Sequence, residues 1–178
     1  MHIILDLDET CINSVENNKN VIDASKFEKF NTLGYTTYIR PHLKEFIDWA
    51  LKHCSVSIWS AGEKTYVFDI VKNLFPDQKI NLLLWRDHCD KCNDDTGMLK
   101  NIDWLNKKIP GLEKYGNILL IDDLKDNCTL NGSNAFNISS FDVSNHGADI
   151  DTAFLDLKNN LENIHNGAVE VSNKFWSL

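Results

Sequence analysis

The stretch HIILDLDET, residues 2–10, decides how the rest of the chain is interpreted. Its first part, HIILD, is a short apolar run of the kind that forms a β-strand buried on both faces. Polar side chains follow at once, with Asp6, Asp8 and Thr10 at alternate positions. In open α/β sheets, ligands bind beyond the carboxyl ends of the strands. This stretch therefore predicts a core strand that delivers two carboxylates to a functional site.

Further along the chain, short apolar runs alternate with amphipathic ones. The predicted strands are 35–39, 55–59, 81–85, 117–121 and a short one at 134–138. The predicted helices are 41–53, 63–74, 99–108 and 150–164. Strands that alternate with helices indicate βαβ units. The fold class is therefore α/β and Rossmann-like, with a mainly parallel central sheet.

Length and composition fit one globular domain. The chain has 178 residues, of which 43% are hydrophobic and 25% charged, as in an ordinary soluble protein. We expect a single domain over residues 1–178, with a loop or small flap at 13–34 and a polar loop at 86–97. The pattern of the tail at 167–178 predicts no element.

Charge and cysteine content narrow the partners and the location. The net charge of -8 argues against general binding to nucleic-acid backbone, which needs clustered Lys and Arg. No apolar run approaches the length of a membrane span, and the first residues lack the features of a secretory signal. Five cysteines, an odd number, indicate reduced thiols. We therefore expect an intracellular protein, cytoplasmic or nuclear, with no membrane segment; composition carries no signal for an oligomeric state.

The residues that follow the other strands carry complementary chemistry. Ser60 follows one predicted core strand, and Asp122 and Asp123 follow another. Lys100 lies at the start of the helix predicted between them. Because the carboxyl ends of parallel strands share one edge of a sheet, these side chains should converge with Asp6. The sequence thus predicts carboxylates, a hydroxyl and an ammonium at one edge.

This set of groups suits phosphoryl transfer. A carboxylate such as Asp6 can act as a nucleophile and form an acyl phosphate. Several carboxylates repel an anionic phosphoryl group unless a cation intervenes, and oxygen-rich sites select Mg²⁺. Lys100 would neutralise charge at the phosphoryl oxygens, and Ser60 would hydrogen-bond to them. Asp8 stands two residues from Asp6 and would protonate the leaving oxygen as a general acid.

Six strings stand in a consistent order along the chain. They are DLDET at 6–10, RPHLKEF at 40–46, SIWSAGEKTY at 57–66, WRDHC at 85–89, MLKNI at 98–102 and LLIDD at 119–123. Together they resemble haloacid-dehalogenase-type phosphatases. They are most similar to the small phosphatases that act on the C-terminal domain of RNA polymerase II, the NLI-interacting-factor-like group. The resemblance implies a three-layer fold with only a small cap or insertion, and a protein serine/threonine phosphatase activity.

The resemblance also implies roles for the residues of the first string. Asp6 would be the nucleophile and Asp8 the acid/base. Thr10 would support the loop of Asp8 at the substrate-binding edge. The metal ligands of the Mg²⁺ ion would be Asp6, Asp123 and the backbone carbonyl of Asp8.

The remaining strings supply the other implied site residues. Ser60 takes the position of a phosphate-binding hydroxyl and Lys100 that of the family's lysine, which Asp122 would hold. Arg86 and Tyr66 fall where the family has substrate-contacting residues. Two features depart from the family: WSAG stands where Phe-Thr-Ala-Ser is usual, and Asp-Asp stands at 122–123 where Asp-Asn is common.

Other interpretations stay open. About 40 residues between Ser60 and Lys100 leave no room for a large cap, so the site should be open and suit a phosphoprotein or phosphopeptide. A nucleotide or polynucleotide-end phosphatase would use the same residues. A phosphate-binding module whose catalysis has lapsed is an alternative of another class. Cys89 and Cys92 invite a zinc interpretation, but no second pair stands at a suitable spacing.

Overall fold

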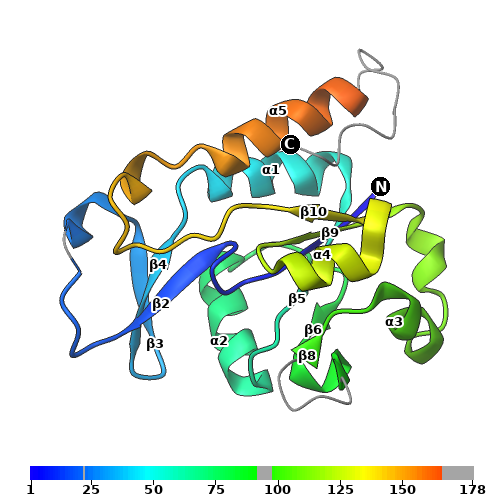
Figure 1. Cartoon of the computed structure of the whole chain (residues 1–178), viewed down its shortest axis with the longest axis horizontal. Coiled ribbons are helices and arrows are strands. Elements are labelled where there is room, and N and C mark those ends of the chain that lie inside the picture. Colours follow the sequence, from blue (N-terminus) through cyan, green and yellow to red (C-terminus); the bar gives the residue numbers. More distant parts are fainter. Residues whose placement is uncertain (22, 92–97, 166–178) are drawn as a thin grey trace.

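The centre of the molecule is a five-stranded parallel sheet with the first strand in the middle (Figure 1). The computed structural model describes residues 1–21, 23–91 and 98–165. In spatial order the strands are β10 (Ala135–Asn137), β9 (Ile118–Asp122), β1 (His2–Leu5), β5 (Ser55–Trp59) and β6 (Leu83–Leu84). Leu5 pairs with Ile58 on one side and with Ile121 on the other. The ends of β9, β1 and β5 therefore lie side by side.

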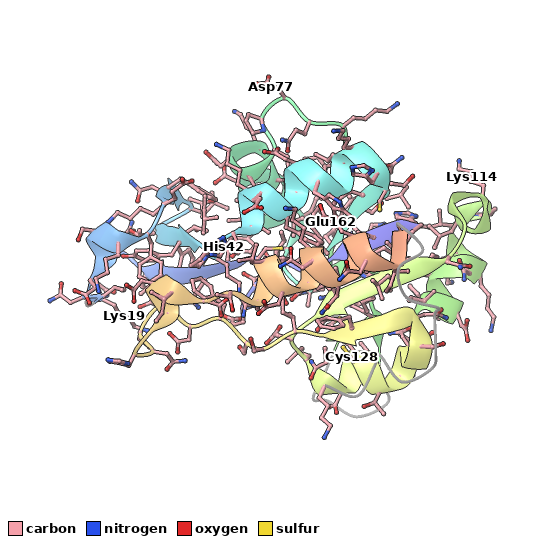
Figure 2. All side chains as sticks on the ribbon, turned by 90° about the horizontal axis from the view of Figure 1, so that it is seen from above. Lys19, His42, Asp77, Lys114, Cys128 and Glu162 are labelled. Atoms are coloured by element: carbon pink, nitrogen blue, oxygen red, sulfur yellow. The ribbon has the colours of Figure 1, made fainter. Side chains whose placement is uncertain are left out.

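Helices cover both faces of this sheet, which gives three layers. They are α1 (Leu43–His53), α2 (Lys64–Leu74), α3 (Ile102–Lys108), α4 (Lys125–Asn131) and α5 (Ala153–His165). Successive residues of β1 point to opposite faces, so Ile3 and Leu5 join a core with α1, α2 and α5. Ile4 joins a second core with α3, and α4 packs at its margin. Figure 2 shows α1 and α5 side by side over one face. The predicted α/β three-layer fold is confirmed.

A small antiparallel sheet stands at one end of the molecule (Figure 1). Its strands are β2 (Ile12–Glu16), β4 (Tyr35–Ile39) and β3 (Lys29–Thr32), in that order. It occupies most of the segment predicted as a loop or small flap, and we call it the insertion sheet. A separate apolar cluster, which includes Phe27, Tyr38 and Phe141, stabilises it.

Several element boundaries differ from the prediction for identifiable reasons. The predicted helix at 99–108 begins only at Ile102, because Met98–Leu99 pairs as β8 with β7 (Asp90–Lys91). The predicted strand at 81–85 is reduced to β6 at the sheet edge. The short 3₁₀ helices are Ala24–Lys26, Arg86–His88, Leu112–Tyr115, Gly132–Asn134 and Ala148–Ile150. Residues 92–97 of the predicted polar loop and the tail at 167–178 lie outside the described residues.

Arg40 joins three parts of the fold. Its side chain is fully buried and forms a two-point ion pair with Asp151, just before α5, at 2.9 and 2.8 Å. It also donates to the backbone carbonyl of Thr10 at 3.1 Å and to Ser139 Oγ at 2.9 Å. The guanidinium therefore ties the loop after β1 to the chain that precedes α5. Among the described helices, none is long and apolar enough to cross a membrane.

Candidate active site

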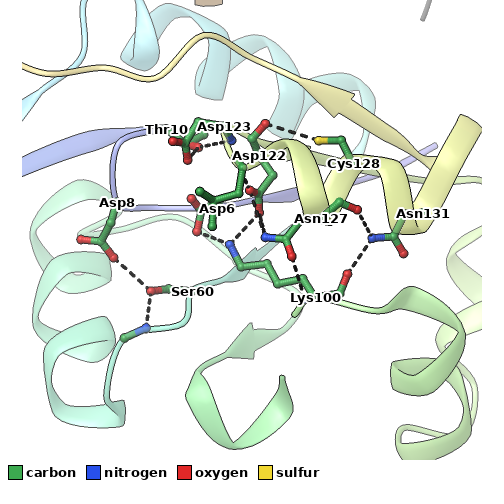
Figure 3. A network of polar contacts seen from close by, with 12 residues as sticks. Asp6, Asp8, Thr10, Ser60, Lys100, Asp122, Asp123, Asn127, Cys128 and Asn131 are labelled. Atoms are coloured by element: carbon green, nitrogen blue, oxygen red, sulfur yellow. Dashed lines mark hydrogen bonds and ion pairs between the residues drawn. The ribbon is translucent and has the colours of Figure 1, made fainter. Parts of the chain in front are cut away.

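Three neighbouring strand ends bring the acidic residues together (Figure 3). Asp6 follows β1 directly, Asp122 ends β9 and Asp123 comes next. One carboxylate oxygen from each of these residues lies within 4.8 Å of the others. Ser60 follows β5 on the other side of β1. The structure thus brings together the strand-end side chains that the sequence predicted to converge.

Lys100 reaches into this acidic group from the chain before α3. Its Nζ contacts Asp6 Oδ1 and lies 2.7 Å from Asp122 Oδ2. All three side chains are buried, with at most 7% of any one exposed. Burial alone would lower the pKa of Lys100, but the two carboxylates outweigh this effect and hold its pKa above the usual value. Lys100 is therefore a fixed positive charge at the centre of the site.

The site carries more negative than positive charge. Burial raises the pKa of Asp6 to about 8, and the attraction of Lys100 offsets only part of this effect. Burial also raises the pKa of Asp123. Among the described residues, three carboxylates here face one ammonium group. Oxygen ligands with uncompensated negative charge suit a hard divalent cation, so this acidic group could hold a metal ion.

Thr10 fixes Asp123 from the loop after β1. Its hydroxyl donates to Asp123 Oδ1 at 3.1 Å and accepts from the backbone N–H of Asp123 at 3.0 Å. Thr10 is fully buried, and Arg40 donates to its carbonyl. The structure therefore places Thr10 beside the acidic group, where it orients a candidate metal ligand.

Asp8 points away from the acidic group toward α2 (Figure 3). Ser60 Oγ donates to Asp8 Oδ2 at 3.2 Å and accepts from the backbone N–H of Gly62 at 2.9 Å. The hydroxyl of Tyr66, on the first turn of α2, donates to Asp8 Oδ1. Burial raises the pKa of Tyr66, so the phenol stays a neutral donor. Both oxygens of Asp8 are therefore held.

Two asparagines of α4 support Lys100, and the sequence prediction missed both. Asn127 accepts from the backbone N–H of Lys100 at 3.0 Å and donates to both oxygens of Asp122 at 3.1 Å. Asn131 donates to the carbonyl of Lys100 at 2.6 Å. Asn127 lies four residues after Asp123, so one helical turn brings it back to the site. That spacing was a signal in the sequence.

Arg86 lies beside the acidic group, at a groove. Its Nε donates to the carbonyl of Ala61 at 2.9 Å, and its Nη1 lies 3.5 Å from Glu63. The groove has a volume of about 560 Å³, and Leu124 and Lys125 also line it. Its walls continue directly from the strand ends that carry the acidic group, so a substrate could extend along it.

The zinc interpretation finds no support in the part of the chain described. Cys89 is buried, and Cys92 lies outside the described residues. Across residues 1–21, 23–91 and 98–165, the group of three metal-capable side chains is the acidic one at Asp6, Asp122 and Asp123.

A parallel α/β sheet with carboxylates, a hydroxyl and a lysine at its strand ends defines the haloacid-dehalogenase class of phosphatases. Within that class, the chain belongs to the NLI interacting factor-like phosphatase family, whose model matches residues 1–172. The chain is 28% identical over 178 residues to a putative CTD phosphatase-like protein, 355R, of Invertebrate iridescent virus 3, covering 90% of this chain and 94% of the viral one. The counterpart in Invertebrate iridescent virus 6 is also 28% identical, with 88% and 94% covered.

Other relatives are larger proteins. A human phosphatase named for the C-terminal domain of RNA polymerase II is 28% identical over 107 residues, which cover 56% of this chain and 11% of that protein. A solved structure of Fcp1, an essential RNA polymerase II CTD phosphatase, matches with a TM-score of 0.56 at 20% identity, covering 93% of this chain and 49% of Fcp1. A fission yeast Fcp1 variant bound to beryllium fluoride matches with 0.53 at 18%, covering 91% and 51%. The chain thus spans about half the length of these structures, which share its fold.

Proposed function

We propose that this phosphatase hydrolyses phosphomonoesters through a phospho-aspartate on Asp6, with Mg²⁺ as its cofactor and phosphoserine or phosphothreonine in a protein segment as its substrate. One observation carries the proposal. The buried ammonium of Lys100 lies between Asp6 and Asp122, with Asp123 at the same strand edge. A nucleophile, a fixed positive charge and a candidate cation site therefore adjoin one another.

In the first step, a carboxylate oxygen of Asp6 attacks phosphorus, and the bond between phosphorus and the leaving alcohol oxygen breaks. Asp8 gives its proton to that oxygen, so that an alcohol leaves. Lys100 stabilises the charge on the phosphoryl oxygens. Ser60 contributes through its hydroxyl, which contacts Asp8 at 3.2 Å. The product of this step is an acyl phosphate on Asp6.

In the second step, water attacks the phosphorus of the acyl phosphate. Asp8, now ionised, accepts a proton from this water, and the bond between phosphorus and Asp6 breaks. Inorganic phosphate leaves and both carboxyl groups return to their initial states. Two easier steps replace one of the slowest uncatalysed reactions known.

The ligands of Mg²⁺ in this proposal are Asp6, Asp123 and the backbone carbonyl of Asp8. Asp122 is less suited, because Lys100 and Asn127 already engage its carboxylate. Thr10 holds Asp123 in place by two hydrogen bonds. When bound, the cation would neutralise the phosphoryl group and the carboxylate that approaches it.

The substrate class rests on the relatives and on the shape of the site. Both viral relatives and the human one are named for the C-terminal domain of RNA polymerase II. The groove beside Arg86 is open to solvent, which suits an extended phosphopeptide. The net charge of -8 disfavours a polynucleotide. An intracellular location, cytoplasmic or nuclear, remains a prediction from the sequence.

Hydrolysis of para-nitrophenyl phosphate tests the chemistry. Wild-type protein should turn over with Mg²⁺ and stop with EDTA. Asp6→Asn should be folded and lose activity by at least ~10³-fold, as expected for loss of a nucleophile. Asp103→Asn, an exposed carboxylate on α3, is the matched control and should keep wild-type activity. Activity that survives in Asp6→Asn would exclude the phospho-aspartate.

A comparison of substrates tests the assignment. A phosphoserine peptide should have a higher kcat/KM than a 3′-phosphorylated oligonucleotide of similar length. Faster turnover of the oligonucleotide would favour the polynucleotide-end alternative. A folded, metal-loaded protein that binds the phosphopeptide and leaves it intact would be the lapsed binding module.

A further inference from the structure

Tyr66 connects the candidate general acid to a different part of the fold. Its hydroxyl donates to Asp8 Oδ1 and lies 2.9 Å from Ser14 Oγ. Ser14 belongs to β2 of the insertion sheet, and its hydroxyl lies 2.9 Å from Thr37 Oγ1 on β4. Thr37 is fully buried. A row of three hydroxyl groups therefore runs from the interior of the insertion sheet to Asp8.

The row can serve Asp8 in both of its protonation states. A hydroxyl group donates one hydrogen bond and accepts others, and either atom can be the donor in the Ser14–Tyr66 and Ser14–Thr37 contacts. Tyr66 can thus donate to ionised Asp8 or accept from the protonated form while the row reverses. A carboxyl group that alternates between acid and base needs such a partner.

Gly62 makes the approach of Tyr66 possible. A Cβ atom at this position would lie 2.8 Å from Cδ1 of Tyr66 and 3.0 Å from Ser60 Oγ. Both of the side chains that hold Asp8 would then have to shift. The chain carries Gly62 in the string WSAG, so the absence of a side chain there leaves room for both contacts.

From these contacts we propose that Tyr66 is a positioning residue, which orients the carboxyl group of Asp8 toward the leaving oxygen and is itself held by Ser14 of the insertion sheet. This proposal rests on the proposed function, because it assumes that Asp8 is the general acid. It assigns Tyr66 an effect on proton transfer, whereas the family resemblance alone implied contact with substrate. The insertion sheet then takes part in catalysis without touching the phosphoryl group.

The dependence of rate on the leaving group separates these two roles. Para-nitrophenol is a much stronger acid than phenol and leaves with little protonation, while phenol needs the proton from Asp8. The two phosphates have nearly the same shape, so a residue that merely contacts a peptide substrate affects them alike. A poorly oriented Asp8 slows phenyl phosphate more. The ratio of kcat/KM for the two substrates therefore reports on proton transfer up to departure of the alcohol.

The experiment measures kcat/KM for both aryl phosphates with Mg²⁺ in wild type, Tyr66→Phe, Ser14→Ala and Asp8→Asn. In Tyr66→Phe, kcat/KM should fall about 10-fold for phenyl phosphate and less than about 2-fold for para-nitrophenyl phosphate. Ser14→Ala should show the same selectivity at about 3-fold. Asp8→Asn should show it more strongly, at about 10²-fold or more. Gly62→Ala should resemble Tyr66→Phe, because the ring must move.

Tyr35→Phe is the matched control, since it removes a phenol hydroxyl at the exposed end of β4 in the same insertion sheet; both rates should stay at wild-type values. Thermal unfolding checks that each variant is folded. Equal effects of Tyr66→Phe on both aryl phosphates, with a loss on a phosphoserine peptide, would overturn the proposal in favour of substrate contact. Unchanged selectivity in Asp8→Asn or activity in Asp6→Asn would instead refute the proposed function.

Discussion

Replacing Arg40 by methionine should lower the free energy of unfolding by about 3–5 kcal/mol. Methionine keeps much of the aliphatic volume and removes the charged group. The guanidinium is fully buried and makes four hydrogen bonds: two to Asp151, one to Ser139 and one to the carbonyl of Thr10. The substitution therefore breaks a buried ion pair and leaves several acceptors without their donor.

The magnitude follows from what is left behind. Removing one partner of a buried pair costs about 3–5 kcal/mol, because the other charge remains uncompensated. Asp151 is 20% exposed, so water can partly solvate the remaining carboxylate and the loss should lie near the lower end. A natural domain is stable by about 5–15 kcal/mol. Arg40→Met should thus stay folded at low temperature but with a large part of its stability lost.

Urea denaturation followed by circular dichroism measures this loss, provided that the slope with denaturant is unchanged. Lys158→Met is the matched control, because it removes a cation that pairs with Glu45 between α5 and α1 at the surface. Surface pairs contribute little, so its stability should stay near that of the wild type. If Arg40→Met unfolds within about 1 kcal/mol of the wild type, the buried pair does not stabilise the fold as argued.

Two further changes test the site through stability alone. Asn127→Ala should lower the free energy of unfolding by about 1–3 kcal/mol, since the backbone N–H of Lys100 and the carboxylate of Asp122 lose a buried partner; a urea midpoint equal to that of the wild type would contradict this. Burial and neighbouring carboxylates raise the pKa of Glu9 from 4.5 to about 7, so its stabilising effect is full below about pH 4.5 and is lost as the pH rises through 7. In EDTA, wild-type stability should fall over this range and that of Glu9→Gln should fall less; parallel curves would refute the shift.

The sequence predicted those parts of the fold in which local pattern and position in the sheet agree. The run that becomes β1 is apolar throughout because both of its faces are covered. Asp6, Ser60 and Asp122 could be placed at one edge since each follows a buried strand, and parallel neighbours end together. The resemblance to the phosphatase family was confirmed by the family model over residues 1–172.

The insertion sheet was harder to anticipate, because its strands are stabilised by distant contacts. Residues 13–34 are polar and were predicted as a loop or small flap, yet β2 and β3 both pair with β4. Polar strands satisfy their backbone groups through such pairing, which no local pattern reveals. The same applies to Ser14, whose partner Tyr66 is 52 residues away.

The charge of the site explains why motif analysis found the reactive groups and missed the supporting ones. Among the described residues, three carboxylates meet one ammonium at the strand ends, so another cation would compete with the metal ion and another anion would repel the phosphoryl group. Orientation must therefore come from neutral groups: the amide of Asn127, and the hydroxyls of Thr10, Ser60 and Tyr66. Such residues are common at surfaces, loops and caps, and only their partners in three dimensions reveal their role. A search for conspicuous charges thus finds Asp6 and overlooks the neutral groups that hold its neighbours in place.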